Sequence, residues 1–237
     1  MESALNAPGQ TDHQVTDFFQ SWALYESIVS HDFMEHSTIT SAICTSLNDR
    51  PPHFSVLDLG CGDSSVMAST LKDLPVSHYT GVDLTEAALD IAKVAPSPAY
   101  PCSWEQRDML DFLRSASQTY DVIVATFALH HLRTEKKQEW LHAASACLNP
   151  GGALYLVDTC REAHETREDA VERYLKLIES WSLTQDGWQI VANHMRGFDF
   201  PETRDWMTRA ITLAKMTFEV IYDHPLRLQM GYVCRPV

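Results

Sequence analysis

Apolar and polar residues change their spacing several times along the chain, and each change marks a predicted element. Between residues 15 and 47 the apolar side chains recur at helical spacing, which predicts two helices. The sequence Arg50-Pro51-Pro52 interrupts that pattern, because proline cannot continue a helix. A first strand is therefore predicted over residues 54–59.

In the middle of the chain, strand and helix patterns alternate. Apolar runs of strand type at 54–59, 79–84, 104–107, 120–126 and 153–157 are separated by helical patterns at 66–74, 86–94, 109–116 and 134–147. Strands separated by helices imply a parallel sheet with helices on both faces. The pattern predicts a doubly wound α/β fold with a mostly parallel, seven-stranded sheet.

After residue 158 the pattern becomes mainly helical. Helices are predicted at 162–183, 186–195 and 201–215, followed by a pair of strands at 218–222 and 228–234 that ends in an antiparallel strand. We expect one domain over 1–237, with an N-terminal helical extension (1–50), a core (54–158), a helical cap (159–216) and a terminal strand pair (217–237).

Composition narrows the classes of partner. The chain has 18 Lys and Arg against 32 Asp and Glu, a formal charge of −14, which disfavours nucleic acid and anionic membranes as partners. Six cysteines without paired spacing predict reduced thiols rather than disulfides or a structural metal site. With no leader pattern and no apolar run of spanning length, the expected location is cytoplasmic.

A glycine turn follows the first predicted strand. Gly60 and Gly62 let backbone amides approach a ligand, and Asp83 ends the second strand, where an acid can accept hydrogen bonds from ribose. A dinucleotide site would have a third glycine where this chain has Ser65, and Asp63 would repel a pyrophosphate. The turn predicts an adenosine-containing cofactor without phosphates, although such a turn also occurs without a ligand.

The segments VLDLGCG, GVDLTEAAL, QRDMLDFL, YDVIVATFALHHL and LNPGGALYLVD follow one another in this order. This series resembles the motifs of class I S-adenosylmethionine-dependent methyltransferases of the small-molecule type, and it extends over residues 54–160. The resemblance implies S-adenosylmethionine (SAM) as the cofactor and S-adenosylhomocysteine (SAH) as its product.

The resemblance also implies which residues contact the cofactor. They are Asp58 as the acid of the first motif; Gly60, Cys61 and Gly62 under the methionine and sugar; Asp83 at the ribose; Leu84, Asp108 and Met109 at the adenine; and Thr126 and Phe127 beneath the methionine portion. Taken singly, each of the three acids could instead cap a helix or lie in a solvated loop. Ser64 is expected to cap the next helix with its hydroxyl.

Candidate groups for the acceptor follow the fourth strand. His130 and His131 stand at its end, and a neutral imidazole can accept a proton near pH 7. Because Leu129 and Leu132 should pack inward together, the two histidines are expected to face different ways. By analogy with small-molecule methyltransferases, His131 is the favoured base. The alternative is a pair that only closes a strand-helix corner by hydrogen bonding.

The flanking helices supply further candidates. Tyr25 lies on a predicted helix that in this family often covers the cofactor as a lid, although an ordinary amphipathic helix would show the same pattern. Aromatic side chains of the cap, most of them expected in its core, could form an acceptor wall; they are Tyr174, Trp181, Trp188, His194, Phe198, Phe200 and Trp206.

The sequence therefore predicts a SAM-dependent methyltransferase acting on an oxygen or nitrogen of a small metabolite. A regulator or inactive subunit of the same fold is the alternative, since fold does not fix function. An oxidoreductase using NAD(P) is disfavoured by the missing third glycine. No metal ligands are predicted, and the acceptor and oligomeric state stay open.

Overall fold

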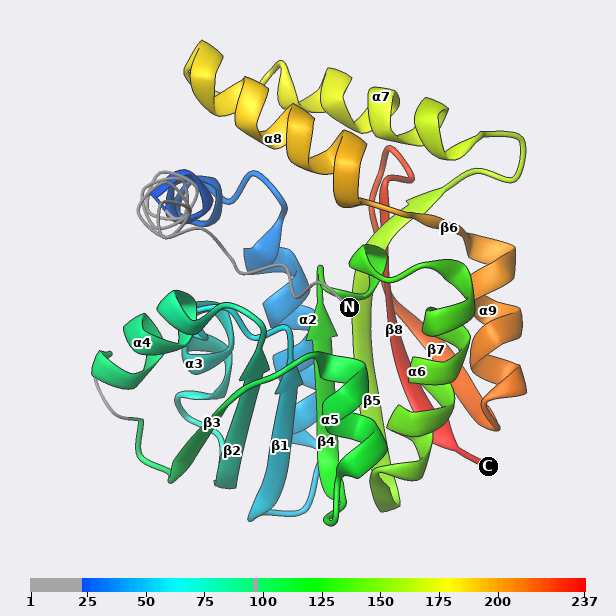
Figure 1. Cartoon of the computed structure of the whole chain (residues 1–237). Helices are drawn as coiled ribbons and strands as arrows, with labels where there is room; N and C mark the ends of the chain where they lie inside the picture. Colours follow the sequence, from blue (N-terminus) through cyan, green and yellow to red (C-terminus); the bar gives the residue numbers. More distant parts are fainter. Residues whose placement is uncertain (1–22, 96–97) are drawn as a thin grey trace, which may run out of the picture.

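The structure, a computed structural model, describes residues 23–95 and 98–237. One sheet runs through these residues in the order β3-β2-β1-β4-β5-β8-β7, and the two-residue strand β6 pairs with β5 off this path (Figure 1). The strands are β1 (Phe54–Leu59), β2 (Val76–Asp83), β3 (Cys102–Gln106), β4 (Tyr120–Thr126), β5 (Leu148–Arg161), β6 (Glu202–Thr203), β7 (Met216–Asp223) and β8 (Gln229–Pro236). Strand β8 runs antiparallel to both of its neighbours, and the other pairings are parallel.

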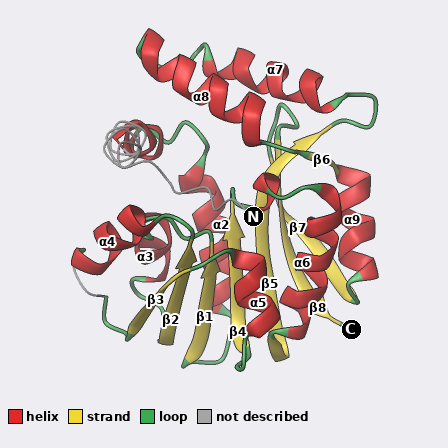
Figure 2. Cartoon of the chain, viewed as in Figure 1, coloured by secondary structure: helices red, strands yellow, loops and turns green. Residues whose placement is uncertain are grey.

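Helices cover both faces of this sheet (Figure 2). They are α2 (His36–Asn48), α3 (Ser65–Leu71), α4 (Glu86–Val94), α5 (Met109–Ser115), α6 (Thr134–Ala146), α7 (Arg167–Ile178), α8 (Gln185–Phe198) and α9 (Arg204–Leu213), with a 3-10 turn η1 at Leu129–His131. Apolar residues of α5, α6 and α9 pack with one face of the sheet, and those of α2 and α3 pack with the other. The predicted doubly wound α/β fold with an antiparallel C-terminal strand is confirmed.

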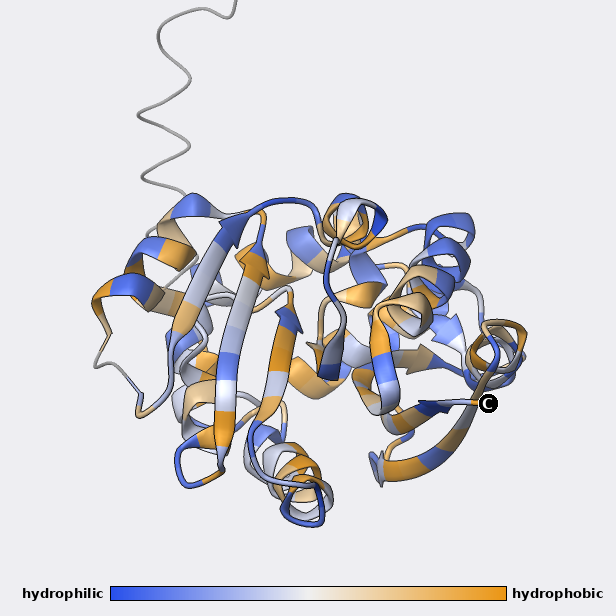
Figure 3. Ribbon diagram, turned by 90° about the horizontal axis from the view of Figure 1, so that it is seen from below, coloured by the Kyte–Doolittle hydropathy of each residue, from blue (hydrophilic) through white to orange (hydrophobic). Residues whose placement is uncertain are grey.

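The central strands β1 and β4 form the middle of the core. Leu57, Leu59, Val122 and Ile123 are fully buried because helices cover the strands from both sides. Figure 3, seen from below, shows that the helices around the strands carry both hydrophobic and hydrophilic residues. Burial on both faces explains why these strands read as apolar runs without alternation.

Strand β5 is longer than predicted and α7 is shorter. The strand continues to Arg161 because its residues 154–159 pair with β8, so the helix predicted from residue 162 is wrong at its start. The backbone amide of Glu162 instead donates to the carboxylate of Glu165, 2.7 Å away, in a turn. Thr166 and Asp169 then form a capping box that begins α7.

The helix predicted over 201–215 is also corrected at its start. Glu202 and Thr203 form β6, which pairs with Cys160 and Arg161 at the end of β5, so the sheet has eight strands rather than seven. The hydroxyl of Thr203 accepts a hydrogen bond from the amide of Trp206, 3.1 Å away, and this cap begins α9. Pairing with a distant strand has outweighed the local helical pattern.

The described N-terminal residues form a helical segment at 23–30, a turn, and α2. Residues 15–22 of the first predicted helix lie outside the described residues. Helices α7 and α8 lie across the carboxyl ends of the strands, and the segment 23–30 lies beside them (Figure 1). No helix within 23–95 and 98–237 has the length and apolar character needed to cross a membrane.

Candidate functional site

The loop after β1 passes so close to the loop after β4 that it requires glycine. Gly60 has a φ of 78°, and a Cβ built on it would lie 2.4 Å from the Cβ of Ala128. Gly62 also has a positive φ, 54°. The backbone amides of Gly60 and Cys61 both donate to the carbonyl oxygen of Val82, at 2.8 and 3.1 Å. The glycines therefore let the ends of β1, β2 and β4 meet at one edge of the sheet.

Asp83 links the loops after β1 and β2. Its Oδ2 accepts a hydrogen bond from the backbone amide of Gly62, and its Oδ1 accepts one from the amide of Thr85, each at 2.8 Å. Each carboxylate oxygen has two lone pairs, so both can accept a further hydrogen bond. Asp83 can thus hold the loop and still bind the hydroxyls of a ribose.

Asp58 is buried beneath the same loop. Asp58 is 2% exposed, and the hydroxyl of Tyr79 donates a hydrogen bond to its Oδ2 at 2.6 Å. Burial raises the pKa of Asp58 to about 7, even though the hydrogen bond from Tyr79 favours the ionised form. A cationic ligand next to this carboxyl would favour its ionisation.

The hydroxyl of Ser64 does not cap α3, contrary to the expectation from sequence. It lies 2.9 Å from the hydroxyl of Tyr79, inside the network around Asp58. The carboxylate of Asp63 accepts from the backbone amide of Ser65 at 3.0 Å and fulfils the capping role.

A small cavity of about 20 Å³ lies between this loop, the end of β4 and the N-terminal segment. Its lining residues are Tyr25, His36, Asp58, Gly60, Cys61, Asp63, Val66, Met67 and Thr126. Beyond Thr126, Phe127 has a φ of 53°, which is rare for an aromatic residue, and its ring meets His36 edge-on with centroids 5.4 Å apart. Backbone conformations of this kind concentrate at functional sites.

Three residues expected at the adenine lie farther along the sheet edge and line neither this cavity nor the larger one described below. Leu84 is 64% exposed after β2, which is unusual for a large apolar side chain. Asp108 caps α5 by accepting hydrogen bonds from the amides of Leu110 and Asp111 at 2.9 and 3.0 Å. Asp108 therefore has the helix-capping role that was the alternative for each acid. Met109 is 9% exposed and packs into the core.

A larger cavity of about 440 Å³ opens beyond Tyr25, which lines both spaces. It lies between the N-terminal segment, the ends of β4 and β5, and helices α7 and α8 of the cap. Its other lining residues are Leu24, Ile28, Met34, Thr85, Phe127, His130, His131, Thr159, Tyr174, Ile178, Trp181, Ile190, Val191, His194, Met195 and Asp199. This mainly apolar lining with a few converging polar groups is typical of a small-molecule site.

The charges around the two cavities favour a cofactor without phosphates. Neither lining contains a lysine or arginine among the described residues, whereas Asp58, Asp63 and Asp199 face these spaces. A pyrophosphate would be repelled here, and a cationic sulfonium would be attracted. The residues present therefore fit SAM and do not fit a dinucleotide.

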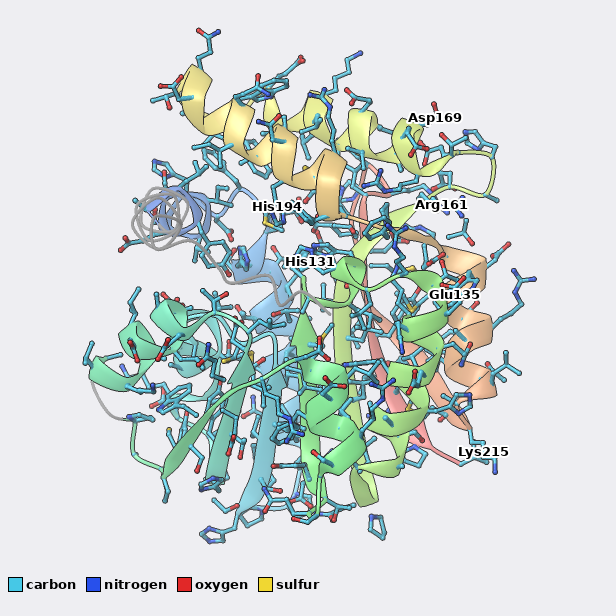
Figure 4. All side chains as sticks on the ribbon, in the orientation of Figure 1. His131, Glu135, Arg161, Asp169, His194 and Lys215 are labelled. Carbon is cyan, nitrogen blue, oxygen red and sulfur yellow. The ribbon has the colours of Figure 1, made fainter. Side chains whose placement is uncertain are left out.

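Four polar side chains converge in the larger cavity, and we call His130, His131, His194 and Asp199 the histidine–aspartate cluster. The Oδ1 atom of Asp199 lies 3.6 Å from the Nε2 of His130, 3.6 Å from the Nδ1 of His131 and 3.6 Å from the Nε2 of His194. Figure 4 shows His194 and His131 close to each other between the cap and the carboxyl end of the sheet.

Asp158 holds His130 from behind. The carboxylate of Asp158 accepts from the backbone amide of His130 at 2.8 Å, and its Oδ1 lies 2.5 Å from the Nδ1 of that ring. Burial lowers the pKa of His130, but the charges of Asp158 and Asp199 outweigh it, so the pKa lies above its ordinary value. His130 is consequently fixed in orientation, with its Nε2 directed toward Asp199.

The other members of the cluster titrate differently. Burial, and then the charges of His130 and His194, hold the pKa of His131 well below its ordinary value. Burial also lowers the pKa of His194 and raises that of Asp199. At neutral pH the rings of His131 and His194 are therefore neutral, and each has a nitrogen lone pair to offer.

The expectation that the two adjacent histidines face different ways is wrong. Leu129 packs into the core as predicted, yet His130 and His131 both line the larger cavity, with ring centroids 4.0 Å apart. They differ in exposure, since the side chain of His130 is 7% exposed and that of His131 is 41% exposed. The turn η1 directs both rings toward the cap.

Of the aromatic residues expected to form an acceptor wall, Tyr174, Trp181 and His194 line the cavity. Phe33, from the turn after the N-terminal segment, stacks on Trp181 at 5.1 Å and joins that segment to the cap. The ring of Phe200 instead lies under the guanidinium groups of Arg133 and Arg167, and Phe198, Trp188 and Trp206 are absent from the lining.

Sequence reasoning missed Asp199 and the role of Asp158. Asp158 stands at the carboxyl end of β5, the same edge as Asp58 and Asp83, and that position was a usable signal. Asp199 lies directly after α8, and no local pattern connects it with His130.

Comparison with known proteins agrees with this geometry. A family model described as a methyltransferase domain matches residues 57–154. An uncharacterized methyltransferase of Staphylococcus carnosus is 32% identical over 184 residues, covering 72% of this chain and 79% of that protein. A malonyl-[acyl-carrier protein] O-methyltransferase of Halalkalibacterium halodurans is 29% identical over 150 residues, covering 56% of this chain and 54% of that protein.

A solved structure shows the same fold. The plantazolicin methyltransferase BpumL, in complex with a monoazolic desmethylPZN analog and SAH, superposes with a TM-score of 0.64 at 16% identity, covering 90% of this chain and 88% of that one. Several curated relatives are matched over only part of their length, since this chain spans 4%, 54% and 44% of three of them. The motif series, the geometry of the loops after β1 and β2, and the match to the Staphylococcus carnosus protein together show that the chain belongs to the class I SAM-dependent methyltransferases, whose cofactor is SAM.

Proposed function

We propose that this protein transfers the methyl group of SAM to an oxygen or nitrogen atom of a small molecule held in the larger cavity. The observation that carries the proposal is the position of that cavity. It has a volume of about 440 Å³, meets the small cofactor-side cavity at Tyr25, and contains the histidine–aspartate cluster. An acceptor in this space would lie beside the methionine end of the cofactor site.

The cofactor is assigned to the edge formed by the ends of β1, β2 and β4. When bound, SAM supplies an electrophilic methyl group on a positively charged sulfur. The residues that we propose to hold it are Asp58, Gly60, Cys61, Gly62, Asp83, Leu84, Asp108, Met109, Thr126 and Phe127. Their backbone amides and carboxylates bind and orient the cofactor, and the carboxylates of Asp58 and Asp83 suit its positive charge and its hydroxyls.

We assign His130, His131 and Tyr25 to the acceptor side. Burial and the charge of Asp63 raise the pKa of Tyr25, so its phenol stays protonated and can donate a hydrogen bond. His130 is held in place by Asp158, and His131 presents a neutral ring to the cavity. Such a weakly basic His131 is better suited to contacting and orienting the acceptor than to removing its proton.

The size and polarity of the cavity support a small acceptor. Apolar and aromatic side chains from the N-terminal segment, the end of β4 and the cap form most of its walls, and such a lining limits the access of water to the reacting groups. The formal charge of −14 is unfavourable for nucleic acid. Two of the similar proteins, by their names, act on malonyl-[acyl-carrier protein] and on plantazolicin.

We also infer that one methyltransferase domain covers the chain. In this division the segment 54–158 binds the cofactor, the helical cap 159–216 closes the acceptor cavity, and the extension 1–50 contributes a lid through Tyr25. The packing of Ile28 with Trp181 and Tyr174 in one apolar cluster supports a shared role for the lid and the cap.

The test has a binding stage and a turnover stage. Calorimetric titration with SAM and SAH, with NAD as control, measures cofactor binding by the purified protein. SAH formation is then followed over a panel of alcohols, phenols, carboxylic acids and amines. Binding of both sulfur nucleosides with turnover of at least one acceptor supports the proposal. Binding without turnover over the whole panel favours a regulator of the same fold instead.

A further inference from the structure

The histidine–aspartate cluster contains a buried oxygen atom without a hydrogen-bond partner. The Oδ1 of Asp199 has none among the described residues, although its side chain is only 7% exposed. Its three nearest imidazole nitrogens lie at 3.6 Å, beyond the range of an N–H···O hydrogen bond. An unsatisfied buried carboxylate is costly, so something else is needed to compensate it.

We infer that the histidine–aspartate cluster is a binding site for one divalent transition-metal ion of the Zn²⁺ class. The ligands would be the Nε2 of His130, the Nδ1 of His131 and the Oδ1 of Asp199, which leaves a fourth position open to the acceptor. Imidazole nitrogens with one carboxylate oxygen are a ligand set that Zn²⁺, Co²⁺ and Fe²⁺ accept, whereas Mg²⁺ and Ca²⁺ prefer oxygen alone.

The distances in the cluster fit this assignment. Two ligands of a tetrahedral ion with bonds of about 2.0–2.1 Å lie about 3.3 Å apart. Each nitrogen-to-oxygen distance here is 3.6 Å, and the candidate ligand atoms of His130, His131 and Asp199 all lie within 4.8 Å of one another. The nitrogen-to-oxygen distances would have to shorten by a few tenths of an ångström, and the widest pair by up to about 1.5 Å, to complete the geometry.

The surroundings of the cluster also favour an ion. Asp158 lies 2.5 Å from the Nδ1 of His130, so the Nε2 of that ring is left to face Asp199. A carboxylate behind a histidine is a usual arrangement at metal sites, because it fixes the ring and increases its basicity. His131 also has a competing contact, since its Nδ1 lies 3.4 Å from the carbonyl oxygen of Phe198. That contact is at the limit of a hydrogen bond and would yield to a metal bond.

Charge and access are consistent with occupancy by a cation. Asp158 and Asp199 together offset the charge of a divalent ion, while the neighbouring Lys137 is already paired with Glu202 at 3.1 Å. The rings of His131 and His194 are 41% and 53% exposed, which leaves a route for the ion from solvent. The ion would sit in the wall of the acceptor cavity.

This inference rests on the proposed function where it concerns the substrate, and it selects among acceptors. An amine that binds the ion has its lone pair occupied and cannot attack carbon, whereas an alcohol or phenol oxygen keeps a second lone pair. The ion lowers the pKa of the hydroxyl, whose proton leaves to water. The oxygen then forms the new O–CH₃ bond, the S–CH₃ bond of SAM breaks, and its electron pair stays on sulfur. The acceptor class is therefore a hydroxyl compound.

The direct test uses Co²⁺, whose visible absorption reports its ligands. The full-length protein is dialysed against a chelator and titrated with Co²⁺, then with Zn²⁺ as competitor. We expect one equivalent per chain, and a loss of affinity of at least about tenfold in Asp199→Asn and in His131→Ala. His142→Ala, at an exposed position on α6, is the matched control and should bind Co²⁺ like the wild type. Titration with SAM verifies that each variant is folded.

The outcomes separate this inference from the proposed function. An absence of stoichiometric Co²⁺ binding, or equal affinity in wild type and Asp199→Asn, overturns the metal site. Acceptor methylation that survives chelation would then leave the proposed function standing alone. Conversely, Co²⁺ binding that depends on Asp199 and His131 supports the site even where no acceptor of the panel is methylated.

Discussion

Gly60 and Ala128 lie so close that a Cβ on the former would approach the Cβ of the latter to 2.4 Å. Gly151 has the same φ of 78° with nothing within 4 Å of its virtual Cβ. Gly151→Ala should therefore lose about 1–2 kcal/mol of unfolding free energy from its backbone conformation alone. Gly60→Ala should lose about 1–3 kcal/mol more from the clash, together with SAM affinity. Urea denaturation and calorimetry compare the two variants, and equal losses would contradict the close approach.

Asp83→Ala should bind SAM about 10- to 100-fold more weakly, because a carboxylate that accepts two backbone hydrogen bonds, and that we propose to bind the ribose, is lost. Asp90→Ala is the control, since Asp90 is exposed and forms a surface ion pair with Lys93. The dissociation constants are measured by calorimetry. Unchanged affinity in Asp83→Ala would remove this residue from the cofactor site.

His131→Ala should lower kcat by about 100-fold with an unchanged dissociation constant for SAM, because the ring lines the acceptor cavity, where it would orient the acceptor, and not the cofactor-side cavity. Initial rates with an acceptor found in the panel, together with a SAM titration, make the comparison. His142→Ala should keep the wild-type rate. A His131→Ala enzyme with full kcat would place the acceptor elsewhere.

Asp58 should make the cofactor-free protein lose stability as the pH rises. Burial raises its pKa to about 7 in the folded state, from an ordinary value of 3.8. The folded state therefore holds the proton more tightly, and the stabilisation present below about pH 4 is lost as the pH rises through about 7. Asp58→Asn, which stays neutral and can still accept from Tyr79, should gain stability relative to wild type between about pH 5 and about pH 8.

Urea denaturation of wild type and Asp58→Asn at about pH 5 and about pH 8 measures this change in unfolding free energy. Asp90→Asn is the exposed control. A difference between Asp58→Asn and wild type that is the same at both pH values would show that Asp58 does not titrate in this range. The same variant should bind SAM more weakly, because the cationic cofactor loses its buried counter-charge.

Local patterns predicted the elements whose boundaries depend on local chemistry. Strands β1 and β4 and helix α4 have the predicted bounds. The apolar run of β1 ends at Gly60, and α4 ends shortly before Pro96. The start of α7 and the strand β6 were missed because pairing with β8 and β5 decides them, and these partners are distant in sequence.

The same distinction holds for the site. Asp58, Gly60 and Asp83 could be located because each follows or ends a predicted strand, and parallel strands bring such positions to one edge. Asp199 could not be located, because it reaches His130 only after the chain has passed through two helices of the cap. The common orientation of His130 and His131 depends on the turn η1, which no apolar spacing encodes.

The pairing of β6 with the end of β5 brings Cys160 beside Glu202 and Arg161 beside Thr203. The chain thus leaves the sheet and returns to it at neighbouring positions, so residues 162–201 form an insertion between two paired strands. Sequence changes inside such an insertion need not disturb the strands of the proposed cofactor site. Related proteins could therefore come to use different acceptors through changes in this insertion alone. Because this insertion supplies His194 and Asp199 while the turn after β4 supplies His130 and His131, such divergence would alter half of the histidine–aspartate cluster and leave the other half inherited.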